Sequence, residues 1–114
     1  MKLKELTAAM DGQVLVPPGG ANRSVRHVVA SDLMSDVLLV DREDMLLLTS
    51  LASDQVLRTA QIVGAIAVVV VNGKPLPSSM PSVAVELGIG LATSPLSKYD
   101  ACVRVHAVLG ASGR

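Results

Sequence analysis

Residues 65–71 (AIAVVVV) constrain the fold more strongly than any other segment of the chain. They are uniformly apolar and rich in valine, with no alternation between apolar and polar side chains. A short continuous apolar run is typical of a strand buried on both faces, such as the central strand of a parallel sheet. The run stops at residues 72–75 (NGKP), which predict a turn. We therefore expect a sheet that is covered by helices on both faces.

Strand and helix patterns alternate along the rest of the chain. Further strand patterns cover residues 13–16, 25–30, 45–48 and 89–92. Amphipathic helix patterns begin near residues 3, 33, 54, 80 and 97. Because strands joined by helices stack in parallel through right-handed crossovers, this order predicts a three-layer α/β fold with a mainly parallel sheet.

Small turn and capping residues set the expected helix ends. Gly12 and Gly88 stand where C-terminal caps belong, and Ser31 with Asp32 offers an N-cap to the helix near residue 33. Ser97, with Asp100 three residues on, resembles a capping box.

Composition places the chain among compact proteins. Half of its 114 residues (50%) are hydrophobic but only 1% are aromatic, which is the reverse of a disordered composition. The length favours one domain, residues 1–110, followed by a flexible tail at 111–114. Residues 17–23 form the best candidate for a mobile loop. So large an aliphatic content in so small a domain predicts an apolar surface that a partner covers.

The charge balance and the single cysteine exclude several classes. Ten basic and ten acidic residues give a formal net charge of zero, and Tyr99 is the only Phe, Trp or Tyr, so we expect no nucleic-acid binding. Cys102 has no second cysteine to pair with, and we expect a buried, inert thiol. No signal-peptide or membrane-spanning pattern occurs, which favours a cytoplasmic location without membrane contact.

Short hydroxyl and acidic side chains gather where three of the predicted strands end. Ligands of parallel α/β sheets bind at this edge, where backbone N–H groups of helix starts hold anions. The candidate ligand-binding residues are Ser31, Asp32, Thr49, Ser50, Asp54, Arg58, Thr93 and Ser94. The alternative is that Ser, Thr and Asp only cap helices and that Arg58 only covers a helix surface.

Catalytic patterns are missing from the sequence. There is no phosphate-binding Gly-Lys-Ser/Thr loop, no Gly-x-Ser-x-Gly elbow and no local metal-ligand spacing, since His27 and His106 are far apart. We therefore expect no catalytic residue, no metal site, no cofactor and no enzymatic activity.

Three segments resemble stand-alone DRTGG-domain proteins. They are residues 29–38 (VASDLMSDVL), residues 46–49 (LLLT) followed by 54–60 (DQVLRTA), and residues 91–102 (LATSPLSKYDAC). The resemblance extends over residues 2–109. The Asp-Arg-Thr-Gly-Gly signature itself is absent: residues 41–44 (DRED) precede a strand instead of following one, and the strand end at 49–52 reads TSLA.

The resemblance implies a fold like that of the N-terminal domain of HPr kinase/phosphorylase. DRTGG domains are regulatory modules beside phosphotransacetylase and CBS-containing pyrophosphatase domains, and they also occur alone. The resemblance therefore implies a non-catalytic regulatory module that forms a homodimer and acts on a partner protein. The alternative is a sensor of a nucleotide or other phosphorylated metabolite, which would be held mainly through its phosphates because stacking rings are lacking.

Overall fold

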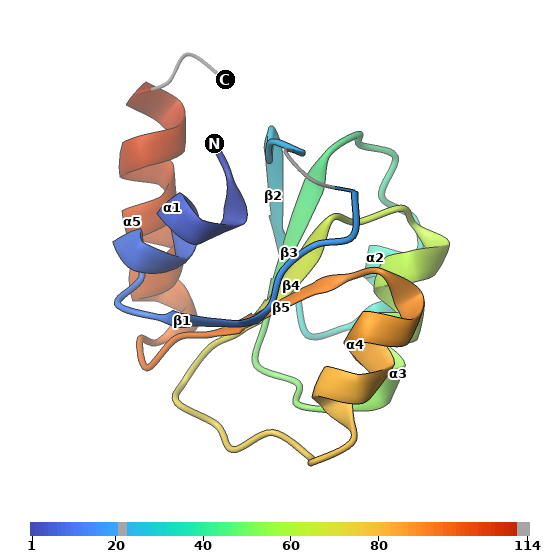
Figure 1. Ribbon diagram of the computed structural model, residues 1–114. Helices are drawn as coiled ribbons and strands as arrows, with labels where there is room; N and C mark the ends of the chain where they lie inside the picture. Colours follow the sequence, from blue (N-terminus) through green and yellow to red (C-terminus); the bar gives the residue numbers. More distant parts are fainter. Residues whose placement is uncertain (21–22, 112–114) are drawn as a thin grey trace.

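The computed structural model describes residues 1–20 and 23–111, and Figure 1 shows their arrangement. The helices are α1 (Leu3–Ala9), α2 (Met34–Val37), α3 (Asp54–Ile62), α4 (Met80–Leu87) and α5 (Lys98–Ala111). The strands are β1 (Gln13–Val16), β2 (His27–Ala30), β3 (Met45–Thr49), β4 (Ala67–Val70) and β5 (Gly90–Thr93). The strands form one sheet in the order β1-β5-β4-β3-β2.

The valine-rich run forms the centre of this sheet, as its sequence predicts. β4 pairs in parallel with β3 on one side and with β5 on the other. All four of its residues are buried. Val68 faces one apolar cluster and Val69 the other, so burial on both faces accounts for the missing alternation.

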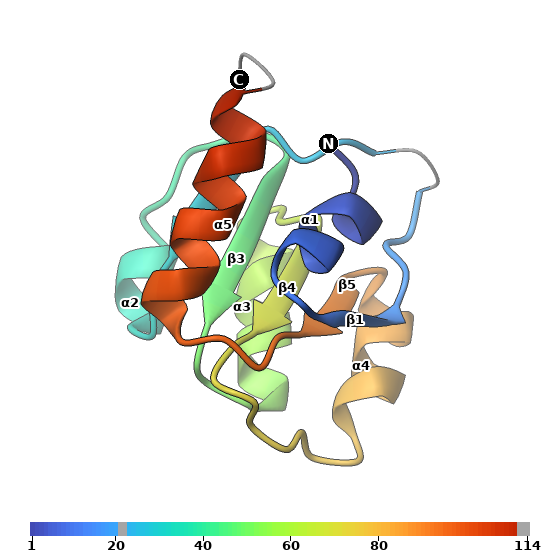
Figure 2. The same ribbon diagram turned by 90° about the vertical axis from the view of Figure 1, so that its left-hand side faces the viewer.

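Helices cover both faces of the sheet, and the expected three-layer α/β fold is confirmed (Figure 2). On one face α1 and α5 pack against Leu46 and Leu48 of β3. On the other face α2, α3 and α4 pack against Met45 and Leu47 of the same strand. Aliphatic side chains fill both layers, so the scarcity of aromatic residues fits two thin cores of Ala, Val, Leu, Ile and Met.

β1 is the exception to parallel pairing. It runs antiparallel to β5, with a shift of register between Val14 and Val16. Gly12 precedes it, and a Cβ on this residue would lie 2.2 Å from the Thr93 carbonyl oxygen. The expected role of Gly12 as a helix cap is therefore wrong: Met10 is the C-cap, Asp11 has a φ of 56°, and Gly12 is needed for close approach to β5.

The other helix ends agree in part with the capping residues. Gly88 caps α4 in the left-handed conformation at a φ of 71°, and the Ser97 hydroxyl accepts a hydrogen bond from the Asp100 amide at 3.1 Å. The N-cap of α2, however, is Leu33, without any side-chain bond. α5 extends to Ala111, and residues 112–114 of the expected tail and 21–22 of the expected mobile loop lie outside the described residues.

Within ranges 1–20 and 23–111, no helix is long and apolar enough to cross a membrane.

Candidate functional site

Four residues from three strand ends meet around the Asp32 carboxylate. Asp32 follows β2, Thr49 ends β3, Ser50 follows it, and Lys98 begins α5. Oδ1 of Asp32 accepts hydrogen bonds from Thr49 Oγ1 at 3.0 Å and from the Ser50 amide at 2.7 Å. Oδ2 accepts one from Ser50 Oγ at 2.5 Å and pairs with Lys98 Nζ at 2.9 Å. We call these four residues the Asp32 cluster.

The cluster keeps Asp32 ionised. Burial by itself raises the pKa of Asp32, but hydrogen bonds from the Ser50 amide, the Ser50 hydroxyl, Lys98 and Thr49 outweigh it. They hold the pKa well below the usual range of an aspartate. Each carboxylate oxygen already has two partners, and its negative charge opposes an anionic ligand. The arrangement is therefore suited to joining the ends of β2 and β3 to the start of α5, and poorly suited to holding a phosphate.

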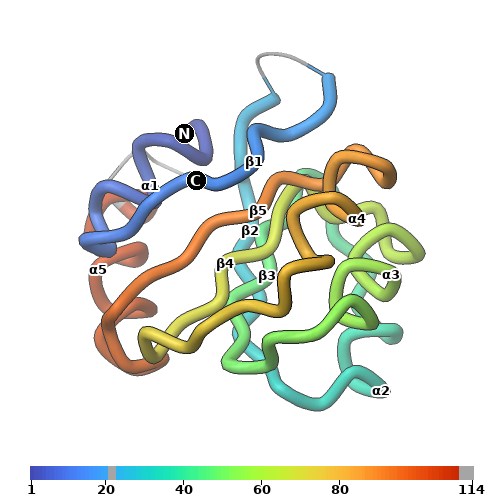
Figure 3. The backbone as a smooth tube through the Cα atoms, turned by 60° about the horizontal axis from the view of Figure 1, so that its bottom comes forward, coloured from blue at the N-terminus to red at the C-terminus, as the bar shows by residue number. Residues whose placement is uncertain are grey.

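Lys98 reaches Asp32 because the loops after β4 and β5 lie side by side, as the tube in Figure 3 shows. The Asn72 amide donates to the Leu96 carbonyl at 2.7 Å, and the Gly73 amide donates to the Ser94 carbonyl at 2.9 Å. Asn72 and Gly73 both have positive φ, which turns the chain sharply here. Sequence reasoning did not select Lys98, because its partnership depends on this path of the loop.

The predicted pair Thr93 and Ser94 lies apart from the Asp32 cluster. Ser94 is buried; its hydroxyl donates to the Met10 carbonyl at 2.7 Å and accepts from the Leu96 amide at 3.2 Å. Thr93 pairs with Gln13 of β1. Both residues line an open polar cleft of about 440 Å³ together with Lys74.

The remaining predicted residues occupy other positions. Asp54, at the start of α3, accepts hydrogen bonds from the Ser79 hydroxyl at 2.8 and 3.0 Å. Arg58 is exposed on α3, and its side chain makes no hydrogen bond or ion pair to any residue of the described ranges. The Ser31 hydroxyl accepts from the Leu33 amide at 3.1 Å. The structure thus brings together Asp32, Thr49 and Ser50, and separates the other candidates from them.

Helix capping does not explain these side chains either. Asp32 bonds to β3 and α5 instead of to α2, and Ser53 at the start of α3 makes no side-chain cap. The Thr49 hydroxyl also accepts from the Leu51 amide at 3.2 Å, closing the turn after β3. Asp32, Thr49 and Ser50 therefore connect the ends of β2 and β3.

A second surface follows the outer edge of β2. The amides of His27 and Ser31 donate to carbonyls of the β3 side, so the residues between them alternate, and Val28 and Ala30 direct their backbone N–H and C=O groups outward. β2 is the terminal strand of the sheet, so these groups face no other strand of the described residues. Such a free edge is a template for pairing with another chain.

Apolar surface flanks this edge on both faces of the sheet. A cavity of about 300 Å³ lies beside β2 on the α5 face, where Val105 and Cys102 line it. On the opposite face a wider depression of about 590 Å³ includes Leu39 in its wall. Leu39 is 82% exposed and Leu33 is 57% exposed. We call β2 with these flanking residues the β2 edge.

Cys102 and two histidines share the cavity on the α5 face. The Cys102 thiol is half-buried. Burial raises its pKa, and the charge of Lys98 lowers it to a lesser extent. His27 Nδ1 lies 2.8 Å from the Glu43 carbonyl oxygen. Among the residues that the structure covers, no group of three His, Cys, Asp or Glu side chains could hold a metal ion.

Comparison with known proteins finds a similar fold among the solved structures. No family model and no curated protein matches the chain. The chain is similar to the crystal structure of the CBS and DRTGG domains of the regulatory region of Clostridium perfringens pyrophosphatase, complexed with its activator, diadenosine tetraphosphate. The TM-score is 0.72 at 13% sequence identity, over 91% of this chain and 45% of that chain. Less than half of that chain is thus matched, and the likeness establishes a shared fold.

Proposed function

We propose, from this regulatory-domain fold, that the chain is a non-catalytic regulatory module that forms a homodimer through the β2 edge and acts on a partner protein. The observation that carries the proposal is the free edge of β2, with the backbone groups of Val28 and Ala30 directed outward. The exposed leucines beside it supply apolar area that a dimer would remove from water.

A symmetric dimer fixes the register of the new strand pair. A twofold axis at Val29 places Val28 of one copy opposite Ala30 of the other, so both outward-facing residues exchange backbone hydrogen bonds. The two Val29 residues then form a non-hydrogen-bonded pair with Cα atoms about 4.5 Å apart. This distance lies within the range that a disulfide bridges.

Light scattering at micromolar concentration tests the association. We expect the wild type to be a dimer and Val28→Pro to be a folded monomer, because proline is tolerated where an edge strand directs its N–H outward but blocks an added strand. Leu39→Lys should weaken the dimer at least tenfold, and Val85→Lys on α4, another exposed apolar residue, should leave it unchanged. A monomeric wild type, or a Val28→Pro protein that stays dimeric, would overturn the interface.

Cross-linking tests the register. In a Cys102→Ala background, Val29→Cys should form a covalent dimer under mild oxidation. Leu15→Cys on β1, at the opposite edge of the sheet, serves as the matched control and should remain a monomer on a reducing-agent-free gel. Equal cross-linking by both variants would indicate random collision and contradict the proposed pairing.

The second candidate function is a sensor of an anionic small molecule, and the polar cleft beside Thr93 favours it. Lys74 makes no ion pair within the described ranges and lines the same cleft as Thr93. We propose that these two residues would contact the phosphates of a nucleotide. Thermal unfolding with ATP, diadenosine tetraphosphate and inorganic phosphate tests this, since a ligand at a hundredfold excess over its Kd stabilises by about 2.7 kcal/mol. If the ligand raises the melting temperature of Lys74→Gln as much as that of the wild type, this cleft is not the binding site.

A further inference from the structure

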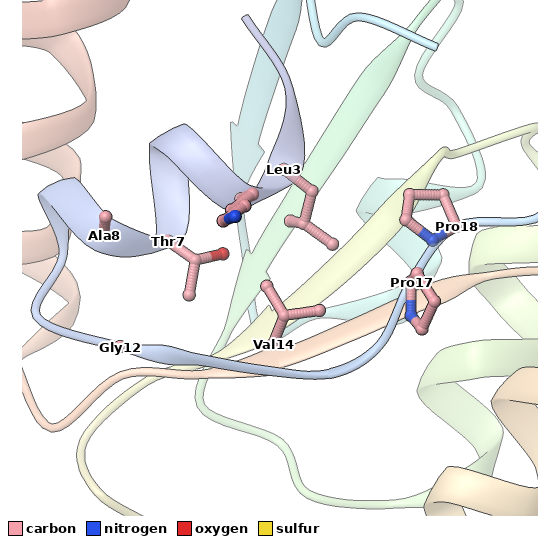
Figure 4. Close-up of a pocket in the computed structure, with 8 residues that line it drawn as sticks. Leu3, Thr7, Ala8, Gly12, Val14, Pro17 and Pro18 are labelled. Carbon is pink, nitrogen blue, oxygen red and sulfur yellow. The ribbon is translucent and has the colours of Figure 1, made fainter. Parts of the chain in front are cut away.

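An apolar cavity of about 440 Å³ lies between α1 and β1, far from the β2 edge in the sheet order (Figure 4). Leu3 and Val14 form opposite sides of it, and the rings of Pro17 and Pro18 close one end. Proline rings are rigid, and a cavity of this size is typical of small-molecule sites.

One buried polar atom in this wall lacks a partner. Thr7 is only 1% exposed, and its hydroxyl makes no hydrogen bond to any residue that the structure describes. The buried hydroxyls of Thr49 and Ser94, by contrast, are both bonded. Figure 4 shows the Thr7 oxygen directed toward the space between Leu3 and Val14. An unsatisfied buried hydroxyl costs free energy, and a polar atom inside the cavity would remove this cost.

A positive charge stands next to the hydroxyl. Lys4 also lines the cavity and has no ion pair within the described residues. Lys4 and Thr7 are three residues apart on α1, so their side chains lie on the same face of the helix. The wall thus offers a hydroxyl donor and an ammonium group beside an otherwise apolar surface.

We propose that this cavity binds a small carboxylic acid with an apolar body. Its carboxylate accepts hydrogen bonds from Thr7 and Lys4, and its body contacts Leu3, Val14 and the two prolines. The proposal is independent of dimerisation, because β1 and β2 are opposite edges of the sheet. Binding at one edge and association at the other can therefore be measured separately.

The test is an amide chemical-shift titration of the full chain with three probes. Octanoate carries both required features, 1-octanol lacks the charge, and inorganic phosphate lacks the apolar body. We expect saturable shifts at Thr7 and Val14 with octanoate, at least tenfold weaker binding of 1-octanol, and no localised shift with phosphate. Non-saturating or scattered shifts with octanoate, or none up to 10 mM (binding weaker than about 2.7 kcal/mol), would overturn the proposal.

Variants locate the binding groups. Thr7→Val keeps the shape of the side chain and removes the hydroxyl, and we expect at least fivefold weaker octanoate binding. Lys4→Gln, a surface change that leaves the fold intact, should have an effect of the same size, whereas Lys74→Gln should have none. Val14→Phe should fill the cavity and abolish binding, and Leu15→Phe, the neighbouring position, should not. Unchanged affinity in both Thr7→Val and Lys4→Gln would refute the assignment.

Discussion

Asp32 and Thr7 differ in opposite directions in their burial and in their hydrogen bonding. Asp32 has two partners on each carboxylate oxygen, although 37% of its side chain is exposed. Thr7 is 1% exposed and has no hydrogen-bond partner for its hydroxyl among the described residues. The comparison teaches that a half-exposed carboxylate can have all its hydrogen bonds satisfied within the protein, while a buried hydroxyl in an apolar wall has none.

Removing the Asp32 carboxylate should have the largest effect on stability. Asp32→Ala leaves the Ser50 amide, the Thr49 hydroxyl and Lys98 without their acceptor. We expect a loss of about 2 kcal/mol in the free energy of unfolding, reduced from the value of a fully buried site by solvent screening. Urea denaturation measures it, with Asp36→Ala on exposed α2 as the matched control. Equal stability of the two variants would mean that the cluster contributes nothing.

Acid should break the same cluster. The pKa of Asp32 is lower in the folded than in the unfolded protein, so its stabilising effect is present above the unfolded-state pKa and is lost as the pH falls toward the folded-state pKa. We expect the stability difference between wild type and Asp32→Asn to shrink from about pH 4 downward. Urea midpoints at pH 6 and pH 3 would show it, and a difference that grows in acid would contradict the assigned sign.

Replacing the Thr7 hydroxyl should have a smaller and opposite effect. Thr7→Val retains the branched shape but removes the unsatisfied group, and we expect a gain of about 1 kcal/mol in the unliganded protein. Thr7→Ser, which keeps the hydroxyl, should show no gain. If Thr7→Val is destabilised, the hydroxyl has a partner in solution and the contrast with Asp32 disappears.

Arg58 should have the smallest effect. It was a candidate ligand-binding residue, yet it is exposed on α3 and contacts no charged partner in the described ranges. We expect Arg58→Ala to change stability by less than about 0.5 kcal/mol. Thermal unfolding with and without ATP would check this. If ATP raises the melting temperature of the wild type but not of Arg58→Ala, Arg58 contributes to ligand binding.

The layered fold could be predicted from the sequence because a strand that is buried on both faces has a continuous apolar sequence. The apolar run around β4 shows this pattern, and α3 buries Val56, Leu57 and Ala60 at the spacing of one helix face. β1 carries no comparable sign of its antiparallel pairing, which depends on the close approach of Gly12 to Thr93.

The site was less predictable because the paths of the loops decide which side chains contact Asp32. Asp32 stands before a helix pattern and therefore resembles a cap, but its partners come from β3 and from α5, the latter 66 residues away in sequence. Lys98 and Thr7 could not be selected in advance. One depends on the hydrogen bonds between the loops after β4 and β5, and the other on the absence of a neighbour.

Because β1 pairs with β5, the first strand to be synthesised is not the first strand that can join the sheet. β1 is made first, yet its partner β5 lies more than 70 residues later in the chain. During translation β1 cannot pair until β5 has been made, and Leu6 and Met10 cannot complete their apolar cluster until α5 has been made. Long-range pairing of this kind slows folding and leaves apolar surface open to aggregation. The segment from α1 to β1 thus depends for its burial on the elements that are made last among those described, β5 and α5.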